Sequence, residues 1–213
     1  MKNLKKLSTI LLFALTAFTS NAQVSDGAPS IGVKGGVNFS NFYTKDVKDE
    51  NVLTGLNLGM YVNVPLNENI SFQPEINFTT KGSEVTYDNF LANGKAKFSL
   101  SYIEVPVLFK ANLAKNFNLH VGPYFAYLVD SKITNESSNP NFNFEQNIDE
   151  NDLNKFDAGI SGGIGFDFDK IGIGARYNYG LTTIGKERNY LGSTYTFPDA
   201  KNSNLNIYVA VKF

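Results

Sequence analysis

The chain has 213 residues, with 19 basic and 20 acidic side chains, 18 glycines, 18 phenylalanines and no cysteine. This length fits a single all-β domain, and a formal net charge of −1 argues against nucleic acid as a partner. The lack of cysteine excludes disulfide bonds and a lipid attached through an amino-terminal cysteine.

The first 22 residues have the pattern of a cleavable export signal. Lys2, Lys5 and Lys6 precede an apolar run over residues 7–18, and the small residues of SNA follow at 20–22. The apolar run is too short to cross a hydrocarbon core of about 30 Å as a helix. We therefore predict cleavage after Ala22, which leaves 16 basic residues against 20 acidic ones, a net charge of about −4, and a short periplasmic segment at residues 23–30.

From residue 31 to residue 213, apolar and polar residues alternate with the period of two that is typical of β-strands. The alternation predicts eight strands, at residues 31–40, 56–64, 70–80, 99–113, 117–130, 156–168, 171–183 and 203–213. In the fourth strand Leu100 is out of phase with Ile103 and Val105, which predicts a bulge near residues 99–102.

The predicted connections alternate between short and long. Short turns are expected at residues 67–69, 114–116 and 169–170, and long loops at residues 43–53, 82–97, 131–155 and 185–202. Short turns at one end, long loops at the other and an even number of strands are typical of an outer-membrane barrel. The sequence therefore predicts an eight-stranded antiparallel up-and-down transmembrane β-barrel over residues 31–213.

The alternation alone leaves open which face lies inside, and a soluble lipocalin-like ligand-binding barrel is the alternative. The large apolar side chains of eight strands exceed the volume inside an eight-stranded barrel, which side chains only just fill. The opposite face is rich in Gly, Ser, Asn and Ala, which are small enough to point inward. We therefore expect the apolar face to meet lipid.

Charged residues on the less apolar face should then lie inside the barrel and pair with one another, because charges in hydrocarbon are costly. The predicted interior polar cluster contains Lys34, Glu75, Glu104, Lys110 and Arg176. Arg176 is expected to contact at least one of the two glutamates. Aromatic residues near the strand ends are expected to form interfacial girdles; they are Phe39, Phe42, Phe78, Phe117, Phe168, Tyr179 and Phe213.

Four segments in order along the chain carry a family resemblance: SFQPEINFTTKG (71–82), YIEVPVLFK (102–110), HVGPYFAYL (120–128) and ARYNYGLTTI (175–184). Together they resemble the PorT-like outer-membrane β-barrel family of Bacteroidota, whose members are often labelled porin-family proteins. The resemblance implies a small barrel similar to OmpA or OmpX in the cell outer membrane. It also implies that the terminal Phe213 is part of a signal that the barrel-assembly machinery recognises. It implies no reaction.

The sequence gives little reason to expect catalysis, a cofactor or a metal. His120 is the only histidine, and it lies near a short turn rather than beside the long loops, so a Ser-His-Asp arrangement is not expected. Asp149, Glu150 and Asp152 form an acidic stretch that lacks the glycine and the spacing of a calcium loop.

The function predicted from the sequence is that of an integral outer-membrane barrel with a structural or surface-interaction role. Its environment is outer-membrane lipid, and its long loops are expected to face outward and contact an unidentified partner. A narrow porin-like transport pore and the soluble ligand-binding barrel remain as alternatives. The last strand, which ends at Phe213, is expected to pair with the first, which begins at Ile31, and so to leave no free edge.

Overall fold

The computed structural model describes residues 27–43, 51–89, 92–138, 141, 143–148, 153–190, 193–197 and 200–213. The strands in these residues are β1 (Ser30–Tyr43), β2 (Asn51–Pro65), β3 (Ile70–Asn89), β4 (Ala92–Asn112), β5 (Phe117–Ser137), β6 (Phe144–Asn147), β7 (Phe156–Phe168), β8 (Ile171–Thr183), β9 (Lys186–Tyr190), β10 (Ser193–Phe197) and β11 (Lys201–Lys212). In the described part of the chain, no helix is long and apolar enough to cross a membrane.

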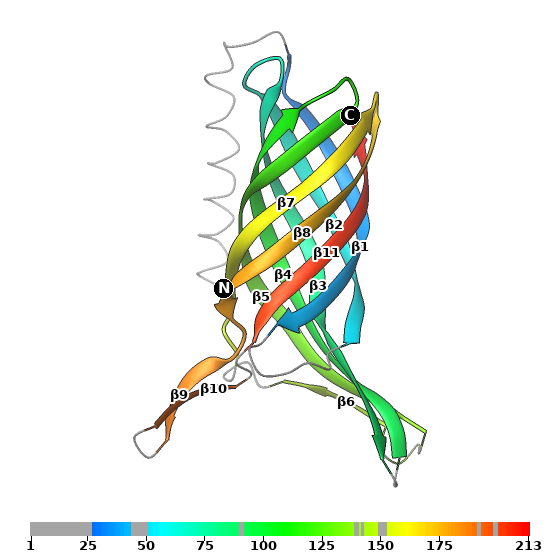
Figure 1. Ribbon diagram of the computed structural model, residues 1–213, viewed down its shortest axis with the longest axis vertical. Coiled ribbons are helices and arrows are strands. Elements are labelled where there is room, and N and C mark those ends of the chain that lie inside the picture. The colour runs from blue at the N-terminus through cyan, green and yellow to red at the C-terminus, as the bar shows by residue number, and fades with distance from the viewer. Residues whose placement is uncertain are drawn as a thin grey trace, which may run out of the picture.

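Nine of these strands form one antiparallel sheet in the order β4-β3-β2-β1-β11-β8-β7-β5-β6, and an additional pairing of β4 with β5 closes the sheet into a ring. Figure 1 shows the tilted strands wrapping around a common axis. The backbone N–H of Phe213 donates to the carbonyl of Ile31 at 2.9 Å, so the last strand pairs with the first as predicted. The prediction of an all-β, antiparallel, up-and-down barrel is confirmed.

The two ends of the ring differ, and we name them by their connections. At the short-turn end, β2 joins β3, β4 joins β5 and β7 joins β8 through tight turns, in which Leu66 N–H donates to the Ile70 carbonyl at 2.8 Å and Leu113 N–H to the Phe117 carbonyl at 3.0 Å. Asp169 adopts a positive φ of 37° in the third turn, a conformation that Asp tolerates better than most residues. Phe213 also lies at this end, next to Ile31.

At the opposite, long-strand end, β3, β4 and β5 continue well beyond the other strands (Figure 1). The loop predicted at residues 82–97 is wrong, because β3 runs to Asn89 and β4 begins at Ala92. The predicted loops at 131–155 and 185–202 likewise contain the end of β5, β6, β9 and β10. Their polar composition is typical of loops, but polar residues on neighbouring strands pair readily across a water-facing sheet.

Cross-strand ion pairs lie along this extension, whose backbone is paired from Lys81 and Leu100 to Asn89 and Ala92. Lys95 Nζ lies 2.7 Å from Glu84 Oε1, and Lys97 Nζ lies 2.8 Å from Glu136 Oε1. The hydrogen bond from Lys95 to the Glu84 carboxylate raises the pKa of Lys95. The extension is therefore a charged sheet beyond the barrel ring rather than an irregular loop.

The predicted irregularity near residues 99–102 is present, but the extra residue lies on the other strand. The pairing of β4 with β5 shifts between Ser101 and Tyr102, where Asp130 and Leu128 are their partners and Val129 is left over. β4 itself pairs with β3 in one continuous register through this region. Leu100 therefore points inward and is buried, and no bulge in β4 turns it toward lipid.

The outer wall of the ring is apolar and the interior is polar. Leu58 on β2 is 67% exposed, whereas Glu75 on β3 and Arg176 on β8 are only 4% and 2% exposed. A soluble barrel would have the reverse arrangement, so the lipocalin-like alternative is wrong. Of the residues predicted for the girdles, Phe42 is buried inside the ring, because it has the same parity on β1 as the inward residues Lys34 and Asn38.

Candidate functional site

The candidate site is the polar interior of the ring, which the alternation of inward and outward residues builds from every barrel strand. On β4 the inward positions follow one another from the short-turn end to the long-strand end in the order Lys110, Leu108, Pro106, Glu104, Tyr102 and Leu100. They mark four successive levels, described below as the mouth, the Glu75 cluster, the Lys81 cluster and the apolar cluster.

The mouth lies at the short-turn end. Lys110 Nζ on β4 lies 2.5 Å from Asp167 Oδ2 on β7, and Asn118 Nδ2 on β5 donates to the same oxygen at 2.9 Å. The Asp167 side chain is about half exposed, so water reaches this level of the barrel.

The Glu75 cluster consists of Lys34, Glu75 and Arg176, which come from β1, β3 and β8. Arg176 donates to both oxygens of Glu75, from Nη1 to Oε2 at 2.8 Å and from Nη2 to Oε1 at 2.9 Å. Lys34 Nζ donates to Oε2 at 2.6 Å. The predicted contact between Arg176 and a glutamate is therefore present, and it has the bidentate geometry that favours Arg over Lys.

Neighbouring polar and aromatic groups complete this cluster. Gln73 and Asn77 also donate to the Glu75 carboxylate, at 2.9 and 3.2 Å. The ring of Tyr208 on β11 lies 4.7 Å from Lys34 Nζ and 5.4 Å from Arg176 Cζ, within the range of cation–π contacts. One carboxylate thus holds two cations, and the cluster has a formal charge of +1.

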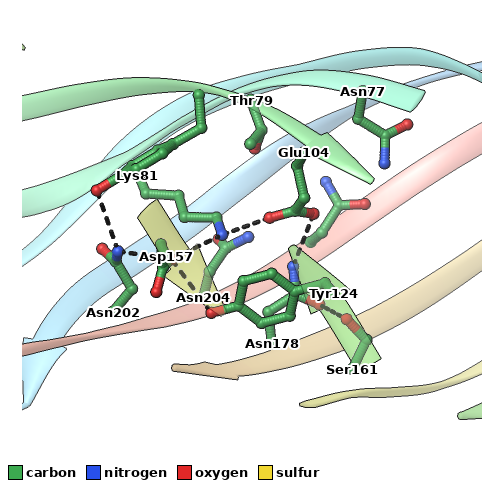
Figure 2. A network of polar contacts seen from close by, with 12 residues as sticks. Asn77, Thr79, Lys81, Glu104, Tyr124, Asp157, Ser161, Asn178, Asn202 and Asn204 are labelled. Atoms are coloured by element: carbon green, nitrogen blue, oxygen red, sulfur yellow. Dashed lines mark hydrogen bonds and ion pairs between the residues drawn. The ribbon is translucent and has the colours of Figure 1, made fainter. Parts of the chain in front are cut away.

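The Lys81 cluster consists of Lys81, Glu104 and Asp157, which come from β3, β4 and β7 (Figure 2). Lys81 Nζ contacts Glu104 Oε2 and lies 3.7 Å from Asp157 Oδ2. The Lys81 ammonium also lies 4.3 Å from the centre of the Tyr124 ring. Two carboxylates surround one cation, so this cluster has a formal charge of −1 and balances the Glu75 cluster.

Hydrogen bonds from three strands hold Asp157 in this cluster. Thr182 Oγ1 donates at 2.7 Å, Asn202 Nδ2 at 2.9 Å and Tyr124 Oη at 3.3 Å. Asn178 Nδ2 lies 3.4 Å from Glu104 Oε1. Figure 2 shows Tyr124, Asn178 and Asn202 converging with the Lys81 cluster on one region of the interior. The network ties strands that are far apart in the sequence.

Buried amides occupy the level between the two clusters. Asn204 and Asn206 on β11 both donate to Asn38 Oδ1 on β1, at 3.1 and 2.8 Å. Asn38 in turn donates to Thr79 Oγ1 at 2.7 Å. These uncharged groups bond to one another in the level between the two clusters of opposite charge.

The apolar cluster closes the interior toward the long-strand end. Its buried members are Phe42, Leu100, Tyr102, Tyr124, Ala126, Leu128, Leu153, Ile184 and Ala200. Leu153 lies outside the named strands and bridges to Gly185, which brings this leucine over the end of the ring. Apolar side chains therefore cover the Lys81 cluster.

The structure divides the predicted interior residues among three levels. Lys34, Glu75 and Arg176 lie together, Glu104 belongs to the Lys81 cluster, and Lys110 lies at the mouth. Lys81 was not predicted, because the third strand was expected to end near residue 80. The parity of Ser71, Gln73 and Glu75 continues to residue 81 and could have identified it.

His120 is the other sequence candidate that lies within the described residues. His120 is buried, its Nδ1 lies 3.2 Å from Asn118 Oδ1, and its ring meets the Tyr208 ring edge-on at 6.3 Å. Asp149, Glu150, Asp152 and the predicted signal at residues 1–22 lie outside the described residues. Of the predicted segment at 23–30, only residues 27–30 are described.

Comparison with solved structures found barrels of low sequence identity. Ail of Yersinia pestis, crystallised with the heparin analogue sucrose octasulfate, is 12% identical with a TM-score of 0.47, and the alignment covers 88% of this chain and 100% of that one. Neisserial surface protein A gives the same identity, coverage and TM-score. The N-terminal β-barrel domain of Pseudomonas aeruginosa OprF is 13% identical with a TM-score of 0.35, over 85% of this chain and 97% of that one.

Comparison with curated proteins gave no significant match. The family model described as "Outer membrane protein beta-barrel domain" matches residues 21–185, which is well over half of the chain. A location in the cell outer membrane agrees with the apolar outer wall of the ring. The chain therefore belongs to the family of outer-membrane protein β-barrel domains.

Proposed function

We propose that the protein is a closed outer-membrane barrel with a structural or surface-interaction role rather than a solute channel or an enzyme. In this proposal eight strands cross the membrane, namely β1, β2, β3, β4, β5, β7, β8 and β11, and β6 lies outside it. The strand order supports this number, because β6 pairs with the far part of β5 at residues 132–135, beyond the pairing of β5 with β7.

The filled interior carries the proposal. A channel needs a continuous column of water, whereas the Glu75 cluster, the amides, the Lys81 cluster and the apolar cluster occupy successive levels. An eight-stranded barrel is only wide enough for its own side chains, and open channels are usual in barrels of sixteen or more strands. The interior therefore acts as a polar core that stabilises the barrel.

The proposed orientation has the long-strand end outside the cell and the short-turn end in the periplasm. Support comes from the usual arrangement of outer-membrane barrels, which have short periplasmic turns and longer extracellular segments. The signal at residues 1–22 would direct export, and residues 23–30 would lie in the periplasm next to β1. The charged extension of β3, β4 and β5 would then be the surface available to an extracellular partner.

We also propose that the chain is a PorT-like outer-membrane barrel of Bacteroidota. The four sequence segments that resemble PorT-like proteins of Bacteroidota lie on β3, β4, β5 and β8, all of which are barrel strands. Phe213 at the end of the chain is proposed as part of the signal for the barrel-assembly machinery. Its position beside Ile31 supports a role in joining the last strand to the first.

A narrow transport pore is the second candidate, and the mouth favours it. The half-exposed Asp167 and its partner Lys110 form a water-accessible entrance at the short-turn end. Passage of a solute beyond this entrance would require displacement of the Glu75 cluster, whose side chains are at most 2% exposed.

Single-cysteine labelling tests the membrane placement and the orientation, because the natural chain has no cysteine. Asn93→Cys places the thiol on the extension, and Lys170→Cys places it in a short turn. A membrane-impermeant maleimide should label the Asn93→Cys protein in intact cells and label the Lys170→Cys protein only after the outer membrane is opened. The reverse result would overturn the orientation, and recovery of the protein in the soluble periplasmic fraction would overturn the membrane assignment.

A further inference from the structure

One sector of the outer wall, on β1, β11 and β8, carries a group of tyrosines next to a lysine. We define the tyrosine patch as Tyr43, Tyr177, Tyr179, Thr183, Lys201 and Ser203. Residues that pair directly across antiparallel strands share a face, and the register pairs Tyr43 with Lys201 and Lys201 with Thr183. Ser203 likewise pairs with Tyr179. The patch therefore forms one continuous surface at the long-strand end.

The tyrosine rings of the patch are held in place by contacts within the wall. The rings of Tyr43 and Tyr179 stack with their centres 4.9 Å apart and an angle of 16° between their planes. The Tyr43 hydroxyl contacts the Gly180 carbonyl, and the Tyr177 hydroxyl lies 2.7 Å from Ser203 Oγ. Tyr177 and Tyr179 nevertheless remain exposed, so they offer fixed aromatic surface to a ligand.

The patch changes in polarity from one row of residues to the next. The row nearest the middle of the wall is Phe39, Leu205 and Tyr177; the next is Asn41, Ser203 and Tyr179; the last is Tyr43, Lys201 and Thr183. On β1 and β11, apolar groups, then hydroxyl and amide groups, and then a cation follow one another toward the long-strand end. On β8 the exposed Leu181 lies between Tyr179 and Thr183, where the pairing of β11 with β8 shifts in register. An amphiphile with acyl chains, a saccharide and a phosphate has the same sequence of properties.

Lys201 differs from Lys97 and Lys132 at this end of the barrel. Lys97 and Lys132 are paired with Glu136 and Glu145, at 2.8 and 3.3 Å. Among the residues that the structure describes, Lys201 has no carboxylate within ion-pair distance. Its charge therefore remains available to an anion at the edge of the apolar wall.

The aromatic residues at the opposite end have a different chemistry. Phe109, Phe117, Phe166 and Phe168 line the outer wall near the short turns, and none of them carries a hydroxyl group. Phenylalanines also lie on the wall toward the long-strand end, namely Phe39 and the 73% exposed Phe156. A general preference of aromatic rings for membrane interfaces would not by itself add the tyrosines Tyr43, Tyr177 and Tyr179 at that end. The difference points to unlike headgroups in the two leaflets.

We propose that the tyrosine patch binds the phosphorylated saccharide headgroup of a glycolipid in the outer leaflet of the membrane. Lys201 would contact a phosphate, the Ser203 and tyrosine hydroxyls would hydrogen-bond to the saccharide, and Phe39 and Leu205 would contact the acyl chains. The inference rests on the proposed orientation, because it requires the long-strand end to lie in the outer leaflet.

Lipid binding to the purified, folded full chain tests the inference. The probes are bis-phosphorylated lipid A, its dephosphorylated form and phosphatidylglycerol, each titrated in mixed micelles and followed by native mass spectrometry. The wild type should prefer phosphorylated lipid A, and Lys201→Gln should weaken its binding about fivefold, as expected for one cation near a lipid phosphate. Tyr179→Leu should weaken the binding of both forms of lipid A.

Matched controls lie on the other side of the ring. Lys132→Gln removes a paired lysine and Tyr127→Leu removes an outward tyrosine on β5, so both should leave lipid A binding unchanged. Equal affinity of the wild type for lipid A and phosphatidylglycerol, or equal losses in the patch and control variants, would overturn the proposal. Full competition by soluble glucosamine 1-phosphate would overturn the lipid as the ligand. A loss of the lipid A preference would not alter the result of the cysteine labelling. The glycolipid proposal and the proposed orientation can therefore be refuted separately.

Discussion

Arg176 and Glu75 are 101 residues apart in the sequence and meet in a bidentate ion pair across the interior of the ring, with N–O distances of 2.8 and 2.9 Å. β2, β1 and β11 separate their strands on one side of the ring, and β4, β5 and β7 separate them on the other. The pair therefore joins opposite walls. Lys34 from β1 binds the same carboxylate, so three walls meet at one group.

Arg176→Met should destabilise the barrel strongly, because it removes the bidentate partner of a buried carboxylate. Loss of one member of a buried ion pair typically costs about 3–5 kcal/mol. Reversible urea unfolding in lipid vesicles measures the effect. Tyrosine fluorescence can monitor the transition because the chain has no tryptophan, and gel migration is a second readout. Lys95→Met removes an exposed ion pair with Glu84 and is the control that should show no measurable change. An equally small effect for both variants would contradict a stabilising role of the Glu75 cluster.

Leu58→Arg should reduce both the stability and the outer-membrane level of the protein, because Leu58 faces lipid. Arginine on the lipid face costs about 2–4 kcal/mol near the middle of the bilayer. Leu113→Arg is the matched control, since Leu113 is 61% exposed in a short turn and Leu58 is 67% exposed on the wall. Unfolding of both variants in vesicles measures the difference. Tolerance of Leu58→Arg equal to that of Leu113→Arg would argue that this wall does not face hydrocarbon.

Gly122→Ala should destabilise the wall of the barrel by crowding. A Cβ atom at Gly122 would collide with the backbone carbonyl oxygen of Val107, which cannot move independently of β4. Overpacking of this kind costs about 1–3 kcal/mol. At Gly162 a Cβ atom would meet nothing within 4 Å, so Gly162→Ala should behave like the wild type. The temperature at which the folded gel band converts to the unfolded band reports both effects, and matching temperatures would refute the crowding.

Phe213→Ala should lower the amount of assembled protein in the outer membrane more than it lowers the stability of the purified barrel. The Phe213 side chain is 77% exposed, so its packing contributes little to the fold, while its backbone N–H pairs with Ile31 in any variant. Phe168→Ala is the control, because Phe168 is 48% exposed at the same end without being terminal. Quantified outer-membrane fractions measure the effect. Unchanged levels of Phe213→Ala would argue against an assembly role.

The barrel ring was predictable from the sequence because alternation and volume act on every strand. Leu58 and Glu75 point in opposite directions for the same reason that their neighbours do, and one polar face had to be internal once the apolar residues could not fit inside. The pairing of Arg176 with a glutamate followed from the cost of an isolated charge in that interior.

The strand extension, the inward position of Leu100 and the place of Lys81 were not predictable, because each depends on the pairing of a strand with its neighbour. The extension at residues 82–97 has a loop-like composition, and only the continuous pairing of β3 with β4 shows that it is a strand. Leu100 was misassigned because the extra residue, Val129, lies on the neighbouring strand. Lys81 was not predicted for a related reason. The composition placed the end of the third strand at residue 80, whereas its pairing with the fourth strand continues to Asn89.

Conductance of the purified wild type in planar bilayers tests the central claim, a closed interior, most directly. Insertion is verified by recovery of the folded, heat-modifiable band. A variant that combines Leu100→Gly, Tyr124→Gly and Arg176→Gly serves as the opened variant, because it removes side chains from both the apolar cluster and the Glu75 cluster. The wild type should give no reproducible channels, while the opened variant should give brief, small openings. Stable channels of uniform size from the folded wild type would contradict the closed barrel and would favour the transport pore.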